Sequence, residues 1–301
     1  MNDVLAAPVG LIGLGKMGSA MALRLAEQDV RVRAYDIDPV PQRRLAGTSG
    51  ISVCPTAAEA AAGCRAVITM LPDWPQITGI LLEGGGLARS AGPGTLVVEM
   101  SSAAPSRTRE VGARLQEAGL RMIDAPVSGG ITGARTGSLT IMVGGAESDV
   151  DDAMPLLRCL GTRITRVGAL GCGHAVKAVN NTLYANSLVA SAEALCTLKA
   201  CGVPVQTAID VLTASSGSNW ALGNRIRRNV TARDFTAAMS AQWMLKDVRH
   251  GVELAAAADG RHEAALVALD AFERYCAAGH GEDVDFGVVR LVEDAFGVTI
   301  D

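Results

Sequence analysis

The sequence predicts two domains, an α/β domain built on a mostly parallel sheet and an all-α domain after it. In the first half of the chain, short runs rich in β-branched residues alternate with helical patterns, which is typical of a parallel sheet with helices on both faces. The strand pattern stops near Val167, and from Gly173 onward the chain reads as helical almost to its end. We therefore expect one domain over 1–168 and a second over 169–301.

The expected strands begin with a buried run at 9–13 and a second run at 30–35, and a helix is expected over 19–28 between them. The helical part opens with one long helix over 173–201, which would span roughly 40 Å at about 1.5 Å per residue. We expect this helix to join the two domains. Further strands are expected at 66–70, 96–99, 122–124, 139–143 and 164–167.

The composition indicates a folded globular protein and excludes several classes of binding partner. Of the 301 residues, 49% are hydrophobic and 19% are charged, with a net charge of -4, so the chain can form two domains with a large core. The absence of a basic stripe argues against a nucleic-acid partner, and the apolar runs are too short to span a membrane. The seven cysteines lack metal-ligand spacing, so we expect reduced thiols, no metal and a cytoplasmic location.

A glycine-rich motif, Gly13-Leu14-Gly15-Lys16-Met17-Gly18, stands between the first expected strand and the first helix. This pattern is the fingerprint of dinucleotide binding. Its first glycine makes a tight turn, its second lets a pyrophosphate approach the backbone, and its third packs helix on strand. The N–H groups at the helix N-terminus then meet the phosphate charge. The alternative is a tight strand-to-helix turn without a ligand.

Asp36, at the end of the second expected strand, indicates which dinucleotide binds. An acid at this position accepts hydrogen bonds from the adenosine ribose and repels a 2′-phosphate, so we expect NAD rather than NADP. A site for NADP usually offers an arginine just after this strand, and here Ile37-Asp38-Pro39 follows instead. Arg43 and Arg44 lie nearby and leave NADP possible.

The most informative segment is 173–181, where Lys177 and Asn181 stand four residues apart in a mostly apolar stretch. On a helix these two side chains share a face. A lysine is costly to bury, and burial lowers its pKa toward working pH, which suits it to proton transfer. The alternative is a surface lysine that keeps its ammonium group in water. His174, three residues earlier, could act as a general base or simply flank the site.

A second glycine-rich segment, 124–130, follows the strand expected at 122–124. Ser128, together with the backbone N–H groups of Gly129 and Gly130, would make a clamp for a small carboxylate. Taken alone, the segment could equally be a turn that caps a strand.

Taken together, these segments resemble the β-hydroxyacid dehydrogenase family, which includes 3-hydroxyisobutyrate dehydrogenase and tartronate semialdehyde reductase. Four segments carry the resemblance in the family's order: 13–18, 124–130, 173–181 and Lys246-Asp247. The resemblance implies a Rossmann-like NAD(P)-binding domain, joined by the long helix to an all-helical substrate and oligomerisation domain. It also implies a homodimer or homotetramer.

The resemblance assigns roles to individual residues. Lys177 would be the catalytic acid/base, and Asn181 would orient the substrate hydroxyl. Lys246 would reach both the substrate and the cofactor. The substrate carboxylate would be bound by Ser128, Gly129 and Gly130, and further cofactor contacts are implied for Met70, Leu71, Pro72 and Ser101.

The expected activity is NAD(P)-dependent oxidation of a short 3-hydroxy acid. The first candidate substrate is 3-hydroxyisobutyrate, because residues 214–220 resemble the Ser-Ser-Gly segment of dehydrogenases for that acid. The alternatives are a more polar acid (threonate, serine or a sulfonated analogue) and the reduction of a semialdehyde such as tartronate semialdehyde. Arg225 would hold the additional polar group if it faces the substrate.

Three other activities fit the sequence less well. 6-Phosphogluconate dehydrogenases carry His-Asn where this chain has Asn180-Asn181, and imine reductases replace the lysine. A non-catalytic dinucleotide sensor, a protein of another class, would keep the glycine motif but would not need Lys177 and Asn181.

Overall fold

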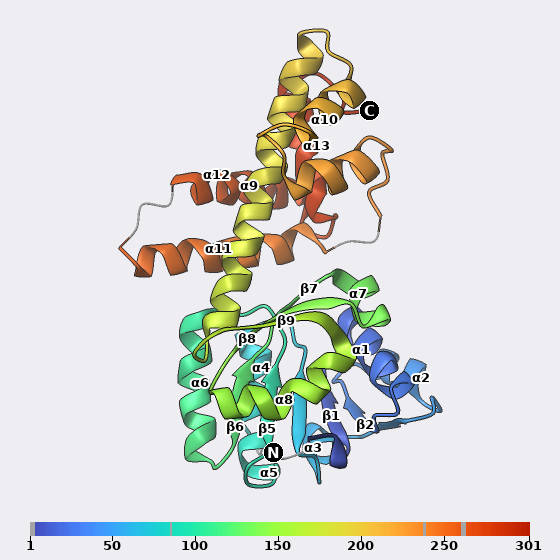
Figure 1. Cartoon of the computed structure of the whole chain (residues 1–301), viewed down its shortest axis with the longest axis vertical. Coiled ribbons are helices and arrows are strands. Elements are labelled where there is room, and N and C mark those ends of the chain that lie inside the picture. Colours follow the sequence, from blue (N-terminus) through green and yellow to red (C-terminus); the bar gives the residue numbers. More distant parts are fainter. Residues whose placement is uncertain (1–3, 85, 237–238, 260–262) are drawn as a thin grey trace. The chain divides into compact units, whose positions relative to one another are not determined.

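The computed structural model describes residues 4–84, 86–236, 239–259 and 263–301. The chain forms two compact units, Met1–Lys177 and Ala178–Asp301, which Figure 1 colours from blue to yellow-green and from yellow to red. The division falls inside one long helix, α9 (Cys172–Ala200). Because α9 contributes to both units, the boundary expected between residues 168 and 169 stays a prediction.

The first unit is built on one nine-stranded sheet with the order β3-β2-β1-β4-β5-β6-β8-β7, in which β9 also pairs with β8. Strands β1 to β6 are parallel, β8 runs antiparallel to β6, and β9 runs parallel to β8. The strand order reverses between β1 and β4, and sheets of this kind bind ligands at the carboxyl ends of such strands. The strands are β1 (Val9–Ile12), β2 (Val32–Tyr35), β3 (Ile51–Val53), β4 (Ala66–Thr69), β5 (Leu96–Glu99), β6 (Arg121–Asp124), β7 (Val127–Ser128), β8 (Leu139–Gly144) and β9 (Gly161–Gly168).

Side chains from alternate positions of the central strands enter two cores, one on each face of the sheet. Leu11 and Ile68 belong to a core that includes α1 and α8, whereas Ile12 and Val67 belong to a core that includes α3, α4 and α6. This burial on both faces explains why the central strands are almost continuously apolar. The helices are α1 (Lys16–Glu27), α2 (Pro39–Leu45), α3 (Ala57–Ala61), α4 (Trp74–Leu82), α5 (Leu87–Ser90), α6 (Pro105–Glu117), α7 (Gly130–Thr136) and α8 (Glu147–Leu160), with a short 3-10 turn η1 (Val4–Ala6) before β1.

The predicted strands are confirmed within a few residues of their expected bounds. The first helix begins at Lys16, directly after Gly15, and not at Ser19. Strands β3 and β7 were not expected, because runs of three and two residues are too short for alternation to show.

The second unit is helical and has a core of its own. Helix α9 runs for 29 residues, as the long helix predicted over 173–201, and the chain turns after it at Gly202 with a φ of 85°. Fully buried Leu188 of α9 packs in one cluster with Phe272 and Phe286. The other elements are α10 (Val205–Thr213), η2 (Ala221–Val230), α11 (Ala241–Ala257), α12 (Glu263–Tyr275), η3 (Cys276–His280), η4 (Asp285–Val288) and α13 (Val289–Phe296).

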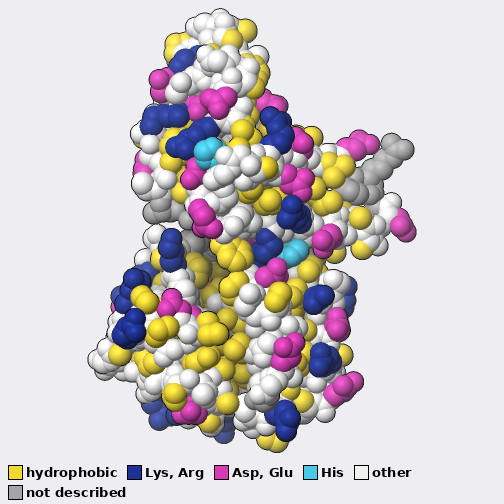
Figure 2. Space-filling model, turned by 180° about the vertical axis from the view of Figure 1, so that it is seen from behind, with side chains coloured by type: hydrophobic (Ala, Val, Ile, Leu, Met, Phe, Trp, Pro, Cys, Tyr) yellow, Lys and Arg dark blue, Asp and Glu magenta, His cyan; other side chains and the backbone are white. Residues whose placement is uncertain are grey.

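Within the described ranges, no helix is both long enough and apolar enough to cross a bilayer. Basic and acidic side chains are interspersed on the face of each unit that Figure 2 shows.

Candidate active site

The loop between β1 and α1 needs its three glycines for different physical reasons. Gly13 has a φ of 95°, and a Cβ there would lie 2.2 Å from the Met70 carbonyl oxygen. A Cβ on Gly18 would lie 1.8 Å from the Gly13 carbonyl oxygen, whereas a Cβ on Gly15 would meet nothing within 4 Å. The fold therefore requires the first and third glycines. The second leaves open space over the loop, as close approach of a pyrophosphate demands.

The N-terminus of α1 is suited to a phosphate group. Its N-cap residue is Gly15, which supplies no side-chain hydrogen bond, so the first N–H groups of the helix remain available to an anion. This N-terminus follows β1, at the edge where the strand order reverses. The residues present thus fit the pyrophosphate of a dinucleotide.

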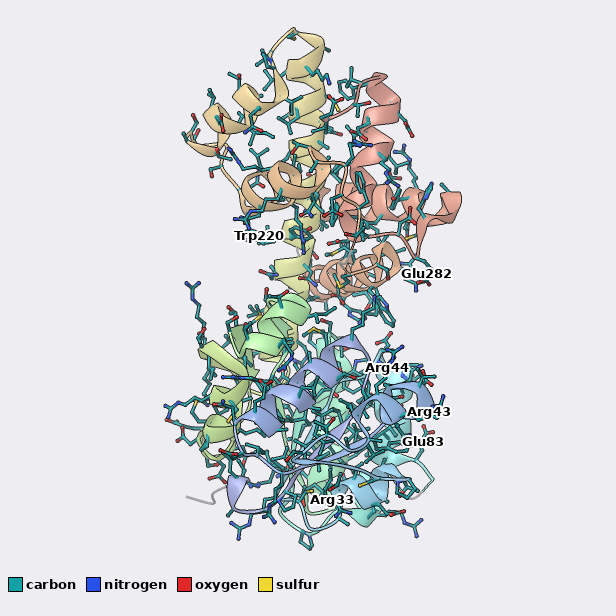
Figure 3. The ribbon with its side chains drawn as sticks, turned by 90° about the vertical axis from the view of Figure 1, so that its right-hand side faces the viewer. Arg33, Arg43, Arg44, Glu83, Trp220 and Glu282 are labelled. Carbon is teal, nitrogen blue, oxygen red and sulfur yellow. The ribbon has the colours of Figure 1, made fainter. Side chains whose placement is uncertain are left out.

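Asp36 follows β2 at the same edge of the sheet. Its Oδ2 accepts a hydrogen bond of 2.5 Å from the Leu14 N–H, and its Oδ1 accepts one of 2.8 Å from the Asp38 N–H. The carboxylate is therefore fixed against the glycine loop, and each oxygen keeps a lone pair for a ribose hydroxyl. Arg43 and Arg44, labelled in Figure 3, are exposed on α2.

The two expected cofactor loops after β4 and β5 are joined to each other. The Leu71 N–H donates to Ser101 Oγ at 2.8 Å, and the Ser101 N–H donates to Glu99 Oε1 at 2.6 Å. Ser101 is buried, Met70 and Leu71 are half-buried, and Pro72 is exposed. The structure thus brings Leu71 and Ser101 together.

Glu99 is a polar residue of this region that the sequence reasoning missed. Its carboxyl group is fully buried and accepts a 2.6 Å hydrogen bond from Thr69 Oγ1. Burial raises the pKa of Glu99 to about 7, and hydrogen bonds from Ser101 and Thr69 oppose that rise. The available signal was a glutamate at the end of an otherwise apolar strand.

The predicted carboxylate loop, Ser128 to Gly130, lies where β7 passes into α7. Ser128 pairs with Thr140 of β8, and Gly129 and Gly130 have φ angles of 128° and 62°. Both glycines are exposed, and Ser128 is half-buried. Only glycine adopts such a pair of conformations readily, so the exposed backbone here follows from the sequence.

In the second unit, Asn181 is anchored by an acid. Asn181 is 4% exposed, and its Nδ2 donates to Asp247 Oδ2 of α11 at 2.6 Å. Lys246 Nζ lies 3.3 Å from Asp247 Oδ1 and 5.4 Å from the centre of the Trp243 ring. The structure therefore joins Asn181, Asp247 and Lys246, two of which were predicted site residues.

Lys177 is the last residue of the first unit and is half-buried. It precedes Asn181 by one helical turn, so both side chains lie on one face of α9. His174, in contrast, is 1% exposed. Its Nδ1 lies 2.8 Å from Thr108 Oγ1, and its Nε2 donates to the Ser101 carbonyl oxygen at 3.1 Å. These contacts favour a structural role for His174 over that of a general base.

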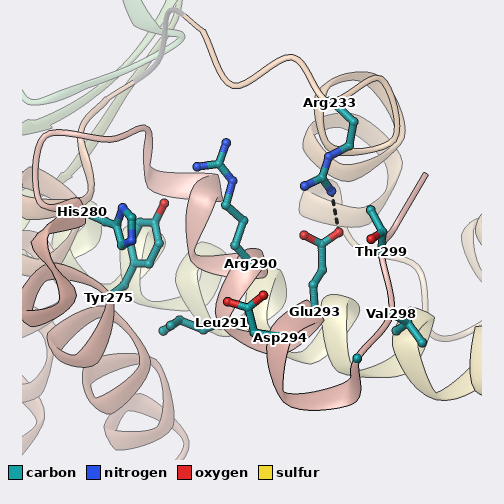
Figure 4. Close-up of a pocket in the computed structure, with 10 residues that line it drawn as sticks. Arg233, Tyr275, His280, Arg290, Leu291, Glu293, Asp294, Val298 and Thr299 are labelled. Carbon is teal, nitrogen blue, oxygen red and sulfur yellow. Dashed lines mark hydrogen bonds and ion pairs between the residues drawn. The ribbon is translucent and has the colours of Figure 1, made fainter.

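A surface hollow of about 490 Å³ in the second unit is a different feature. Figure 4 shows its lining, where Arg233 donates to Glu293 at 2.5 Å. Arg290 also lines the hollow and lies 3.6 Å from Asp283, which is not part of the lining. Both arginines thus have carboxylate partners, and none of the predicted site residues lines this hollow.

Comparisons with known proteins agree with this geometry. One family model, the NAD binding domain of 6-phosphogluconate dehydrogenase, matches residues 8–168, and another, the NAD-binding of NADP-dependent 3-hydroxyisobutyrate dehydrogenase, matches residues 171–292. The NAD-dependent L-serine dehydrogenase of Pseudomonas aeruginosa is 35% identical over 292 residues, which is 95% of this chain and 97% of that one. The 2-(hydroxymethyl)glutarate dehydrogenase of Eubacterium barkeri is 32% identical, with 97% of each chain covered. A solved structure of Mycobacterium tuberculosis 3-hydroxyisobutyrate dehydrogenase with L-serine has a TM-score of 0.87 at 30% identity and covers 95% of this chain and 99% of that one.

The fold, the glycine loop and these relatives define an oxidoreductase that uses NAD or NADP and acts on a hydroxyl group of a small molecule. The chain belongs to the β-hydroxyacid dehydrogenase family. The fold class, the family and the class of enzyme predicted from the sequence are thereby confirmed.

Proposed function

We propose that the protein oxidises a short 3-hydroxy acid with Lys177 as the acid/base. The observation that carries this proposal is the Lys177–Asn181 pair on one face of α9, with Asn181 held by buried Asp247. Bound NAD⁺ would supply the acceptor for the hydride of the carbinol carbon. The Lys177 amine would take the hydroxyl proton, and in the reverse direction its ammonium group would return it.

The other proposed residues bind and orient. Asn181 would hold the substrate hydroxyl, because its amide is fixed through Nδ2 by Asp247. Ser128, Gly129 and Gly130 would hold the carboxylate through a hydroxyl and backbone N–H groups. The Lys246 ammonium group, next to Asp247, would supply positive charge to the substrate and the cofactor. A fixed geometry of this kind lowers the barrier because little reorientation remains at the moment of reaction.

We propose NAD as the preferred cofactor. Asp36 supports this preference, since its carboxylate is fixed beside the glycine loop and would repel a 2′-phosphate. The ratio of kcat/KM values for the two dinucleotides tests it, and a ratio equal to one or favouring NADP would contradict the role of Asp36.

For the substrate, 3-hydroxyisobutyrate remains the first candidate, and one observation favours a more polar acid. Tyr184 follows Asn181 by three residues on α9. Among the described residues its hydroxyl makes no well-aligned hydrogen bond, nor do Arg225 Nε and Asp285 Oδ1, although the three side chains interact with one another. All three atoms are buried. The charge of Asp285 offsets that of Arg225, so this cluster suits a hydroxyl or amino group better than a second carboxylate.

The three groups act on one another electrostatically. Burial raises the pKa of Asp285 to about 6, which the Arg225 charge opposes. Burial, and then the Asp285 charge, raises the pKa of Tyr184 well above its ordinary value. The Arg225 guanidinium also lies 5.7 Å and 5.5 Å from the Trp220 and Phe286 ring centres. We therefore propose serine-like or threonate-like acids as the second candidates.

The test is a panel of 3-hydroxyisobutyrate, L-serine and threonate with NAD⁺, followed by NADH absorbance. With the best acid, Lys177→Ala is expected to lower kcat about 10²–10⁴-fold while the Kd for NADH stays within about twofold. Near-normal turnover in that variant would refute the mechanism. NADH binding without turnover of any acid would favour a dinucleotide sensor.

We also propose a homodimer or homotetramer in a reducing compartment such as the cytoplasm. Val179 and Leu183 of α9 are 46% and 62% exposed, and apolar side chains at this spacing suit contact with a second copy. All seven cysteines are free thiols. Light scattering after gel filtration measures the oligomeric state.

A further inference from the structure

The start of α9 is held by Asp124, a carboxylate that the proposed chemistry does not use. Asp124 ends β6 and is fully buried. Its Oδ1 accepts from the Gly171 N–H and its Oδ2 from the His174 N–H, both at 2.7 Å. These are backbone groups at a helix N-terminus, where N–H donors lack partners within the helix. Asp124 therefore anchors the first turn of α9 to the sheet.

The approach of the helix to Asp124 is close enough to require glycine. A Cβ on Gly173 would lie 2.8 Å from Asp124 Oδ2 and 2.4 Å from the Met142 carbonyl oxygen, and a Cβ on Gly144 would lie 2.4 Å from Asp124 Oδ1. Two glycines thus make room for one carboxylate. Such a contact leaves the helix start little freedom to shift along or around its axis.

His174 makes the second attachment of this turn. Its ring is buried between Thr108 of α6 and the Ser101 carbonyl oxygen, and it meets Trp74 edge-on with 6.4 Å between ring centres. A carbonyl oxygen can only accept, so Nε2 carries a proton in this arrangement. The hydroxyl of Ser101 in turn accepts from the Leu71 N–H. A continuous chain of contacts therefore runs from both expected cofactor loops to α9.

Lys177 follows His174 by three residues, which is about 4.5 Å along the helix axis. Resting on the proposed role of Lys177, we infer that Asp124 and His174 are positioning residues that fix the Lys177 amine relative to the cofactor loops. Neither residue needs to touch the substrate for this role. Loss of either attachment should leave Lys177 chemically intact but displaced from the hydroxyl proton.

A double-mutant cycle tests this inference, because it asks whether His174 acts through Lys177. The variants are His174→Leu, Lys177→Ala and the double variant, with kcat expressed per NADH-binding site. We expect His174→Leu to lower kcat at least about 10-fold in the parent and less than about twofold in the Lys177→Ala background. The Kd for NADH should stay within about twofold of the parent value throughout.

Milder variants cover the case in which His174→Leu does not fold. Thr108→Val removes the hydroxyl that meets Nδ1, and His174→Gln retains an N–H donor for the Ser101 carbonyl oxygen. We expect each to lower kcat by a smaller factor than His174→Leu. Asp124→Asn, which turns one acceptor into a donor facing an N–H, should lower kcat as His174→Leu does. His280→Gln, at a histidine that pairs with Asp283, is the matched control and should keep kcat within about twofold.

The outcomes separate this inference from the proposed function. If Lys177→Ala alone retains near-normal turnover, the proposed role of Lys177 as the acid/base is refuted. If Lys177→Ala is impaired and the His174→Leu effect is undiminished in its background, only the positioning role is overturned. An unchanged kcat per binding site in both His174→Leu and Asp124→Asn, or a loss of NADH affinity that accounts for the lower activity, would also overturn it.

Discussion

Substituting the second glycine of the motif should separate cofactor binding from folding. In Gly15→Ala the new methyl group meets nothing within 4 Å, and the φ of -58° at Gly15 is one that alanine adopts freely. The folded state is therefore not strained. Alanine also has fewer unfolded conformations than glycine, which stabilises a protein by about 0.4–1 kcal/mol where the backbone is compatible.

The same methyl group fills the space that a pyrophosphate would enter. If the methyl group breaks one charge-assisted hydrogen bond between a backbone N–H and the pyrophosphate, the binding free energy falls by about 1.5–3 kcal/mol. This loss weakens NADH binding about 10- to 100-fold. Gly18→Ala should behave in the opposite way. Its Cβ would lie 1.8 Å from the Gly13 carbonyl oxygen, and backbone on both sides must move, at a cost of about 1–3 kcal/mol or more.

The assay compares NADH affinity by fluorescence titration with the thermal midpoint of unfolding for each variant. Gly79→Ala, in α4 and also free of neighbours within 4 Å, is the matched control and should raise Tm slightly without changing the Kd. We expect Gly15→Ala to weaken NADH binding at an unchanged or higher Tm, and Gly18→Ala to lower Tm. Parent-like NADH affinity in a folded Gly15→Ala variant would refute the placement of the pyrophosphate over Gly15.

Three further predictions concern buried or fixed carboxylates. Asp36→Asn should shift the ratio of kcat/KM values at least about tenfold toward NADP by removing the charge that repels a 2′-phosphate, as steady-state kinetics with both dinucleotides will show. Burial raises the pKa of Glu99 from 4.5 to about 7. The protonated side chain therefore contributes fully to the free energy of unfolding below pH 4.5, and this contribution is lost as the pH rises through 7. The loss is on the order of 3 kcal/mol, so the Glu99→Gln variant should show a smaller fall in Tm between pH 5 and 8 than the parent protein. An identical fall in both proteins would contradict the raised pKa of Glu99. Asp247→Ala should lower kcat about 10- to 100-fold by releasing the Asn181 amide, with the NADH Kd unchanged in the same fluorescence titration.

The features predicted correctly from the sequence depend on short stretches of chain. The glycine motif, the long helix and the buried strands each show their pattern within a few to some tens of residues, because helix and strand periodicities are local. The Lys177–Asn181 pair is also local, since one helical turn determines that its side chains share a face. Such features need no knowledge of which elements pack together.

The features that the sequence did not predict depend on contacts between distant segments. Asp124 accepts from backbone groups 47 and 50 residues later, and Thr69 reaches Glu99 across 30 residues. Nothing in the neighbourhood of either acid marks it as a partner for those groups. His174 was left open between two roles for the same reason, because its burial depends on Thr108 and Ser101, which come from other elements.

Three acids hold the parts of the proposed site without being assigned to the chemistry itself. Asp36 accepts from the backbone of the glycine loop, Asp124 from the start of α9, and Asp247 from the Asn181 amide. A carboxylate in a poorly solvated place costs free energy unless its oxygens accept hydrogen bonds, and each of these acids accepts at least one from a group in or beside a predicted functional residue. Each acid thus links its own burial to the orientation of a neighbour. Substitutions at Asp124 and Asp247 should therefore change kcat more than the Kd for NADH, because the orientation of the reacting groups matters most in the transition state.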